Sequence, residues 1–279
     1  MALQASGAIS LSNVNVELGN SSTAQINIGS TSVRTLFGVA SGQIKMSDGY
    51  GKANDFTLTI SSDTTDIDIA TAATAAGWNG SVYLMVVINS GIYVSATSTA
   101  SPAMTISGSF PNGLKVTNNG YIVGKGGAGG AGGDATNTSA TYGSAGGAGG
   151  KALSVSSSVT FDNTSGVIAG GGGGGGGSAG SYDQISNLYS YGGDGGGGGR
   201  SSKSSSAGGA AGTGQTSNGT AGNPGTFSAA GTSYAGNGGD WGAAGVSVVG
   251  AAGGAAGACL TGNSNITWIA TGTRYGSVS

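Results

Sequence analysis

Apolar and polar positions in the first part of the chain predict short helices and one strand. Residues 12–18 and residues 32–37 carry apolar side chains at helical spacing, and a glycine follows each of them as a helix end. Residues 25–28 alternate between polar and apolar, as a strand does. The pattern therefore predicts a compact opening segment over residues 1–51.

The next part, residues 52–110, has the pattern of a small, mainly β domain. An Ala-rich stretch over residues 67–76 predicts one helix. An Asn-Ser-Gly turn between two apolar runs favours a β-hairpin. The predicted strands cover residues 56–60, 82–88, 92–94 and 103–107.

From residue 111 to residue 279 the pattern changes, because strand-like leads run into glycine tracts. The leads span residues 114–124, 159–170 and 266–276, and such repeats imply that like units stack. Glycine is costly to order, because it loses more backbone freedom on folding than any other residue. The tracts are therefore either disordered or held by an arrangement that only glycine permits.

Matched tract lengths favour the ordered alternative. The octaglycine at residues 170–177 and the GKGGAGGAGG tract at residues 124–133 belong to about seven tracts of similar length. As left-handed threefold helices they would form rods of about 25–31 Å, joined sideways by backbone hydrogen bonds. The expected fold class is a mainly β N-terminal part with short helices, followed by a bundle of left-handed polyglycine II helices linked by loops and short strands.

Composition excludes several functional classes. Charged residues make up 7% of the chain and the net charge is −2, which argues against a partner bound through basic clusters, so no nucleic acid is expected. The start lacks the pattern of a secretory signal peptide. The longest apolar run, residues 82–88, is too short to cross a bilayer. A single cysteine, Cys259, excludes an intrachain disulfide framework, and its Ala/Gly surroundings indicate a small core residue.

Catalytic chemistry is not indicated either, so no catalytic residue, metal or cofactor is predicted. The chain has no histidine, which removes the commonest general base, and Glu17 is its only glutamate. Asp63, Asp66 and Asp68 have part of the spacing of a calcium loop but lack its downstream ligands, so a solvated loop is favoured.

Aromatic residues in the loops between the tracts are the candidate binding residues. These loops are rich in Ser, Thr, Asn, Gly and Tyr, which is the composition of adaptable binding loops. The alternative is that the rings only cover the ends of the glycine tracts. The candidates are Tyr142, Tyr182, Tyr189, Tyr191, Phe227 and Tyr234.

Several of these motifs resemble one family of viral proteins. The opening ALQASGAISLSNVNVELG, with VRTLFGVASG and KMSDGYGK, is similar to the N-terminal segment of tailed-bacteriophage tail and fibre-tip proteins. NNGYIVGKGGAGGAGG, the octaglycine, GNGGDWGAAG and NITWIATGTRYG resemble phage receptor-binding adhesins with a polyglycine sandwich. The resemblance implies a non-enzymatic adhesin, part of the virion at the phage tail or the tip of its tail fibre.

The resemblance also implies partners. Residues 1–110 would join other phage tail or fibre proteins, with residues 1–51 as the virion-attachment segment, and residues 111–279 would bind a bacterial surface receptor, either an outer-membrane protein or a glycan. The chain would act as a homo-oligomer such as a trimer, or as a single cap on a trimeric fibre. Two other functions stay open: a purely structural spike or plug, and an ice-binding protein, which would want flat Thr or Ala arrays.

Overall fold

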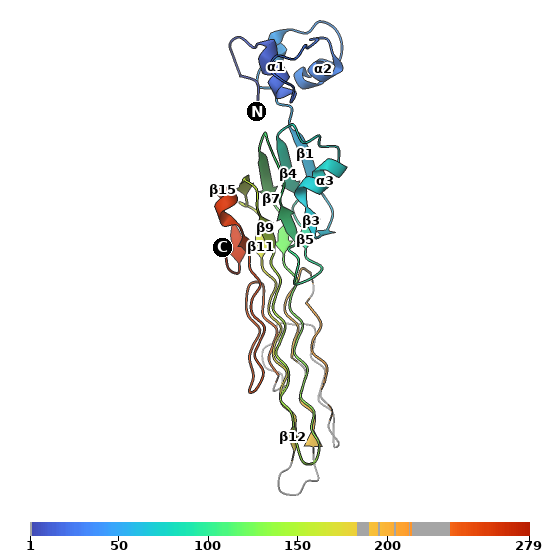
Figure 1. Ribbon diagram of the computed structural model, residues 1–279, viewed down its shortest axis with the longest axis vertical. Helices are drawn as coiled ribbons and strands as arrows, with labels where there is room; N and C mark the ends of the chain where they lie inside the picture. The colour runs from blue at the N-terminus through green and yellow to red at the C-terminus, as the bar shows by residue number, and fades with distance from the viewer. Residues whose placement is uncertain (1, 183–189, 195, 204, 212, 214–234) are drawn as a thin grey trace.

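The computed structural model describes residues 2–182, 190–194, 196–203, 205–211, 213 and 235–279. The molecule is elongated (Figure 1). A small helical unit lies at one end, stacked strands form the middle, and extended glycine-rich segments run from the strands to the other end, where β12 (Ser181–Tyr182) lies. We call that second extremity the far end.

The N-terminal unit is built from α1 (Leu11–Glu17), α2 (Thr31–Phe37) and a 3-10 turn, η1 (Met46–Gly49). Both predicted helices are therefore confirmed. Ser10 caps α1 through a capping box with Asn13. Gly38 ends α2 in the left-handed conformation, at φ 71°, as the glycine after this helix predicted.

The strand predicted over residues 25–28 is wrong, because these residues pair with no strand in the described part of the chain and their backbone is irregular. The unit has its own hydrophobic cluster, in which side chains of both helices pack together. Its buried members are Leu3, Ile9, Val14, Val33, Leu36 and Phe37.

The middle of the molecule is a solenoid of three parallel sheets. The chain passes through the first, second and third sheet in turn and then begins another coil, so strands distant in sequence become neighbours. The first sheet holds β1 (Phe56–Ile60), β4 (Leu84–Ile88), β7 (Leu114–Asn118), β10 (Val159–Asp162) and β15 (Ile266–Ala270). The second holds β2 (Thr64–Thr65), β5 (Tyr93–Ser95), β8 (Tyr121–Val123), β11 (Val167–Ala169) and β16 (Thr273–Tyr275). The third holds β3 (Ile67–Asp68), β6 (Met104–Ile106), β9 (Leu153–Val155) and β14 (Leu260–Thr261).

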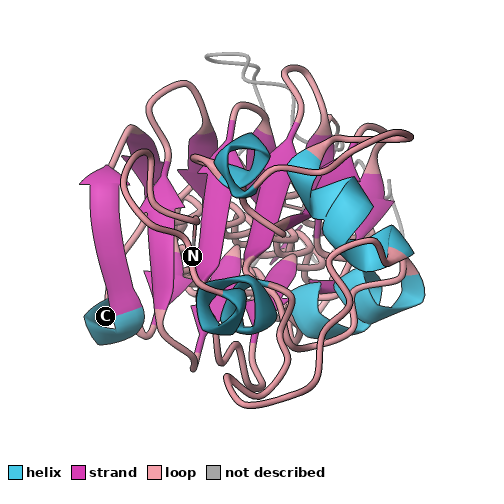
Figure 2. Cartoon of the chain, turned by 90° about the horizontal axis from the view of Figure 1, so that it is seen from above, coloured by secondary structure: helices cyan, strands magenta, loops and turns pink. Residues whose placement is uncertain are grey.

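Few other elements accompany these sheets. Helix α3 (Ile69–Ala75) lies between the first two coils, and η2 (Asn263–Asn265) precedes β15. At the far end, β12 (Ser181–Tyr182) and β13 (Ser190–Tyr191) form an antiparallel pair. Seen from above, the strands line up side by side, and helices and the N-terminus lie in front of them (Figure 2).

The predicted hairpin around the Asn-Ser-Gly turn is wrong. β4 and β5 flank this turn but lie in different sheets, and β4 pairs in parallel with β1 and β7. Gly91, at φ 76°, makes a corner of the solenoid at this point. A sharp turn between two apolar runs makes a β-hairpin only when the two runs pair with each other. Here each run pairs instead with the equivalent strand of a neighbouring coil.

Rows of equivalent side chains fill the interior of the solenoid. In the first sheet, Val86, Val116 and Phe161 occupy matching positions on β4, β7 and β10, and each is at most 1% exposed. In the second sheet, Val94, Ile122 and Ile168 form a corresponding row and are fully buried. Parallel pairing places each residue next to the equivalent residue of the following coil. Buried residues that recur along the sequence therefore stack into one continuous core.

Two buried asparagines hold a corner of the solenoid. Asn118 ends β7 and Asn163 follows β10, and neither side chain is exposed. The Asn118 amide donates to Asn163 Oδ1 at 2.7 Å, and the Asn163 amide donates to the Thr271 carbonyl at 2.9 Å. The Gly120 N–H donates to Asn118 Oδ1 at 3.1 Å. Side-chain amides thus link the corners of three successive coils.

The glycine tracts are insertions between the second and third sheets. One insertion leaves after β8 and returns at β9, and a second leaves after β11 and returns at β14. The second insertion therefore lies between β11 and β14 of the same coil. β10 before it still pairs in parallel with β15 after it.

The inserted segments pair with one another through their backbones. Successive N–H groups of the octaglycine donate to different neighbours: Gly172 to Arg200, Gly173 to Ala243 and Gly174 to Gly147, at 2.8–2.9 Å. These segments lie so close that a side chain has no room. A Cβ on Gly174 would lie 1.9 Å from the Ala128 carbonyl oxygen, in a place that only glycine can occupy.

The fold class predicted from the sequence, a mainly β N-terminal part followed by a polyglycine II bundle, is wrong. The chain is an α/β fold in which three parallel sheets run from residue 56 to residue 275 and few helices accompany them. The prediction divided the chain by composition. Parallel pairing ignores that division, because β10 and β11 pair with β7 and β8 before the lead and with β15 and β16 after the glycine-rich stretch.

We expect Gly174→Ala to destabilise the protein by about 2–3 kcal/mol, because the added methyl must push two backbones apart. Chemical denaturation measures this loss. Ala128→Ser is the control, since Ala128 is exposed on a neighbouring segment and should leave stability unchanged. Equal stability of the two variants would show that the segments are not in close contact.

We expect Asn163→Ala to lower the free energy of unfolding by about 2–3 kcal/mol, because it removes the bond from Asn163 to the Thr271 carbonyl and leaves the buried Asn118 amide with only a long bond of 3.4 Å to the Val167 carbonyl. The matched control is Asn89→Ala, which removes an exposed asparagine at another corner of the solenoid. Urea denaturation of both variants tests the prediction. It fails if the control loses as much stability as Asn163→Ala.

Candidate functional site

The predicted binding aromatics lie in different situations. Tyr189, Phe227 and Tyr234 lie outside the described residues. Tyr182 belongs to β12 and Tyr191 to β13, and in this antiparallel pair at the far end each tyrosine lies opposite a serine, Tyr182 opposite Ser190 and Tyr191 opposite Ser181.

Tyr191 and Tyr142 present their rings to solvent. The exposed fraction is 46% for Tyr191 and 70% for Tyr142, which are high values for aromatic side chains. Tyr142 follows the loop in which Ala135 and Ala140 form a bridge, and the Asp134 carboxylate there accepts from the N–H and the hydroxyl of Thr213. These two hydrogen bonds hold the pKa of Asp134 below its usual value.

Tyr142 has an apolar neighbour that sequence reasoning missed. The Tyr142 ring lies against Gly250, where an added Cβ would lie 2.1 Å from the ring. Gly250, at φ 83°, belongs to a tight turn in which Val248 and Ala251 exchange backbone hydrogen bonds at 2.9 and 3.1 Å. Val249 at the tip of this turn is 84% exposed.

We call residues 246–251 the valine turn. Val246 is also exposed, at 52%, and its carbonyl accepts from the Gly176 N–H near the end of the octaglycine. The signal in the sequence was the run Val-Ser-Val-Val inside a tract otherwise made of Gly and Ala. Valines in such a tract have no hydrophobic core to pack against, so the side chains of Val246 and Val249 stay exposed. Tyr142 and the valine turn together form an exposed patch of aromatic and aliphatic surface.

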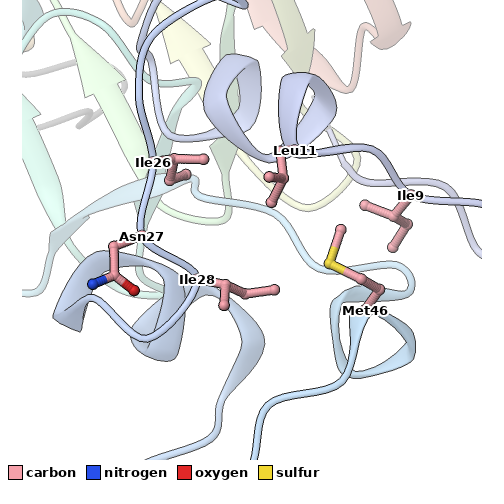
Figure 3. Close-up of a pocket in the computed structure, with 6 residues that line it drawn as sticks. All are labelled: Ile9, Leu11, Ile26, Asn27, Ile28 and Met46. Carbon is pink, nitrogen blue, oxygen red and sulfur yellow. The ribbon is translucent and has the colours of Figure 1, made fainter.

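A second candidate site lies in the N-terminal unit, at the opposite extremity. It is an open hollow of about 660 Å³ between α1, η1 and residues 26–28. Figure 3 shows the side chains of Ile9, Leu11, Ile28 and Met46 directed toward the space between these elements. Leu11 is 47% exposed. The lining is apolar apart from one amide, and comprises Ile9, Leu11, Ile26, Asn27, Ile28 and Met46.

The three aspartates weighed as a calcium loop are used within the fold instead. The Lys203 ammonium donates to Asp63 at 2.6 Å, which together with the Tyr93 N–H lowers the pKa of that carboxyl. Asp66 accepts from the Thr97 N–H, and Asp68 caps α3 by accepting from the Thr71 N–H. Among the described residues no three acidic, His or Cys side chains lie close enough together to hold a metal ion.

Cys259 lies in the core of the solenoid, as its surroundings in the sequence predicted. It is fully buried, its thiol donates to the Ile168 carbonyl at 3.3 Å, and burial raises its pKa to about 11. A thiol held in this way is unreactive at neutral pH. Within the described part of the chain, the helices are too short or too polar to cross a membrane.

Comparison with known proteins identifies the family. Residues 55–279 match the family model of the phage tail fibre adhesin Gp38. The chain belongs to this family. The resemblance drawn from the glycine tracts and the flanking motifs is therefore confirmed. A Gp38 adhesin is a component of the phage tail fibre, so the predicted place in the virion is confirmed as well.

One solved structure resembles the Gp38-family chain over most of its length. It is the crystal structure of the gp37-gp38 adhesin tip complex of the bacteriophage S16 long tail fiber, with a TM-score of 0.55 and 23% sequence identity. The match covers 88% of this chain and 91% of that chain, and at this identity it shows a common fold. No curated protein matches the chain.

Proposed function

We propose that this adhesin attaches a phage to its host cell, holding the tail fibre with its N-terminal unit and a bacterial surface receptor with its far end. The observation that carries the proposal is the separation of two apolar surfaces. The hollow of the N-terminal unit lies at one extremity, and the exposed aromatic and valine residues lie on the glycine-rich segments that run to the other. A non-enzymatic linker between two partners needs this separation.

The proposed receptor surface consists of the patch formed by Tyr142 and the valine turn, together with the exposed Tyr191 on β13. Tyrosine supplies a large rigid contact area with a hydroxyl at its tip, and such residues dominate binding energy in recognition surfaces. The remaining candidates from the sequence, Tyr182, Tyr189, Phe227 and Tyr234, stay proposed receptor contacts, and the last three lie outside the described residues. The receptor would be an outer-membrane protein or a glycan.

The fibre surface is the hollow of the N-terminal unit. The adhesin of phage S16 is in a complex with gp37 at the tip of a long tail fibre. We infer that this chain likewise caps a fibre protein, and that an apolar segment of that protein fills the hollow against Leu11 and Ile28. The uncharged lining suits an apolar occupant, since burying a charge there would be costly.

The predicted division at residues 51 and 110 stays a proposal. The N-terminal cluster is separate from that of the solenoid, which agrees with an attachment unit over residues 1–51. The second cluster joins side chains on both sides of residue 110, among them Met104, Leu114 and Phe161. Residues 52–110 therefore contribute to the fold that carries the receptor surface.

We expect Tyr142→Ala combined with Val249→Ser to reduce phage adsorption at least tenfold, because both side chains are exposed and central to the proposed contact. Adsorption rates of phage carrying the variant measure this. The control is Val16→Ser, an exposed valine on α1 far from the patch. Unchanged adsorption of a folded variant would contradict the receptor surface and favour a purely structural spike.

We expect Leu11→Asp to prevent the adhesin from joining the fibre while leaving the purified chain folded, because Leu11 is half exposed in the free protein. Immunoblots of purified phage particles and circular dichroism of the purified chain measure the two effects. Val16→Asp, on the same helix but outside the hollow, is the control. Normal incorporation of Leu11→Asp would refute docking at the hollow.

A further inference from the structure

Two turns of the glycine-rich segments face the solenoid without being part of it. The first, at residues 200–203, reverses the chain between antiparallel neighbours, shown by the bridge between Arg200 and Ser205 and by the Gly209 N–H donating to Gly196. The second, at residues 240–243, reverses it again, and the Val246 N–H donates to Asn237. The described residues between 192 and 259 supply no strand to the three parallel sheets.

Segments joined to these turns cannot set their own register. Their bonds to the octaglycine and to Ser178 after it repeat every third residue: Gly172 donates to Arg200, Gly175 to Gly197 and Ser178 to Asp194. If the segment slid by three residues, equivalent N–H and C=O groups would meet again. Glycine offers no side chain to distinguish the two arrangements, so register is weakly specified by the tract alone.

Side chains at both turns bind the outer face of the second sheet. Trp241 lies between Tyr121 and Tyr275, with ring centroids 6.1 and 6.2 Å away. The Lys203 ammonium is 2.6 Å from Asp63 and lies over the Tyr93 ring at 5.1 Å. Tyr93 and Tyr121 are themselves stacked, with their centroids 4.3 Å apart and their planes within 8°.

The two turns are also joined to each other. The Arg200 guanidinium lies over the Trp241 ring at 3.7 Å and pairs with Asp240 at 2.8 Å. The Trp241 indole N–H donates to the Ser201 carbonyl, and the Arg200 N–H donates to Gly239 at 3.0 Å. We call the turn residues Arg200, Lys203, Asp240 and Trp241, with the sheet residues Asp63, Tyr93, Tyr121 and Tyr275, the latch.

We infer that the latch sets the register of the glycine segments and thereby positions the receptor surface. Trp241 and Lys203 are large or charged, and a slip by three residues would carry both away from their partners. The same slip would move the far end of a segment by up to about 10 Å relative to its neighbours. A side-chain contact away from the latch depends on the same register, because the Asp134 carboxylate accepts from the N–H and the hydroxyl of Thr213 on another segment. The part of the inference that concerns the receptor rests on the proposed function.

A distance measurement on the purified full chain tests the register directly. Nitroxide labels are placed at Ala210→Cys and Ala255→Cys, two exposed positions on different segments, while the buried Cys259 stays unlabelled. Pulsed electron paramagnetic resonance should give one distance with the latch intact. With Trp241→Ala and Lys203→Asp together, we expect a second population displaced by up to about 10 Å. A single unchanged distance would overturn the inference.

Two measurements distinguish the loss of the latch from a general loss of stability: amide hydrogen exchange, and a variant in which the charges of Lys203 and Asp63 are reversed. Trp241→Ala should raise amide exchange roughly tenfold in residues 196–203, 205–211 and 235–246, with β7 and β10 unchanged. The control Tyr83→Ala removes a half-buried aromatic elsewhere on the solenoid and should not do so. Adding Asp63→Lys to Lys203→Asp should restore the protection that Lys203→Asp loses. Faster exchange throughout the molecule, or no rescue, would contradict a local latch.

Adsorption of phage carrying the same variants distinguishes the two proposals. A displaced distance with reduced adsorption supports both the latch and the receptor surface. A displaced distance with normal adsorption supports the latch and contradicts the proposed position of the receptor surface. An unchanged distance overturns the latch, whatever the adsorption rate.

Discussion

Backbone groups of one glycine segment reach those of the next only where no side chain separates them. In water an N–H or C=O group finds a partner in any case, but inside a packed group of segments each one needs a protein partner. The octaglycine meets this requirement on all sides, because its N–H groups donate to segments from three other parts of the chain. A single Cβ at Gly174 would be placed 1.9 Å from a carbonyl oxygen. The composition of the chain's second half follows from that distance.

The same requirement explains why the segments depend on the solenoid. Ordering glycine costs more conformational entropy than ordering any other residue, and glycine buries no side chain to offset that cost. The solenoid supplies what the segments lack: a continuous row of buried Val, Ile and Phe and a fixed spacing between coils. Segments that leave after β8 and β11 therefore begin in parallel and in register, and their first hydrogen bonds continue those of the second sheet.

Local elements were predictable from the sequence, whereas their pairing was not. The helix ending at Gly38 and the strand at β6 carry their signals within a few residues, and both are confirmed. The stacking of like units was also visible in the three leads that became β7 with β8, β10 with β11 and β15 with β16. The fold class and the hairpin at residues 82–94 were wrong, because both depend on which strands pair across long separations in sequence. No local pattern records that choice.

The candidate site shows the same division between local and distant information. Exposed Tyr142 could be predicted, because an aromatic residue in a polar loop has no core to join. Its neighbour, the valine turn, lies more than a hundred residues further along the chain and reaches Tyr142 only through the pairing of the glycine segments. The hollow at Leu11 was likewise hidden, since Ile26 and Ile28 had the alternation of a strand yet line an open surface. At both places the surrounding fold leaves apolar side chains uncovered, and that exposure is a property of the assembled molecule. Since each insertion begins and ends at one corner of the solenoid, its length and its loops can change while the rows of Val116, Ile122 and Phe161 stay as they are. A fold with this construction lets the glycine-rich segments vary at little cost to the stability of the solenoid.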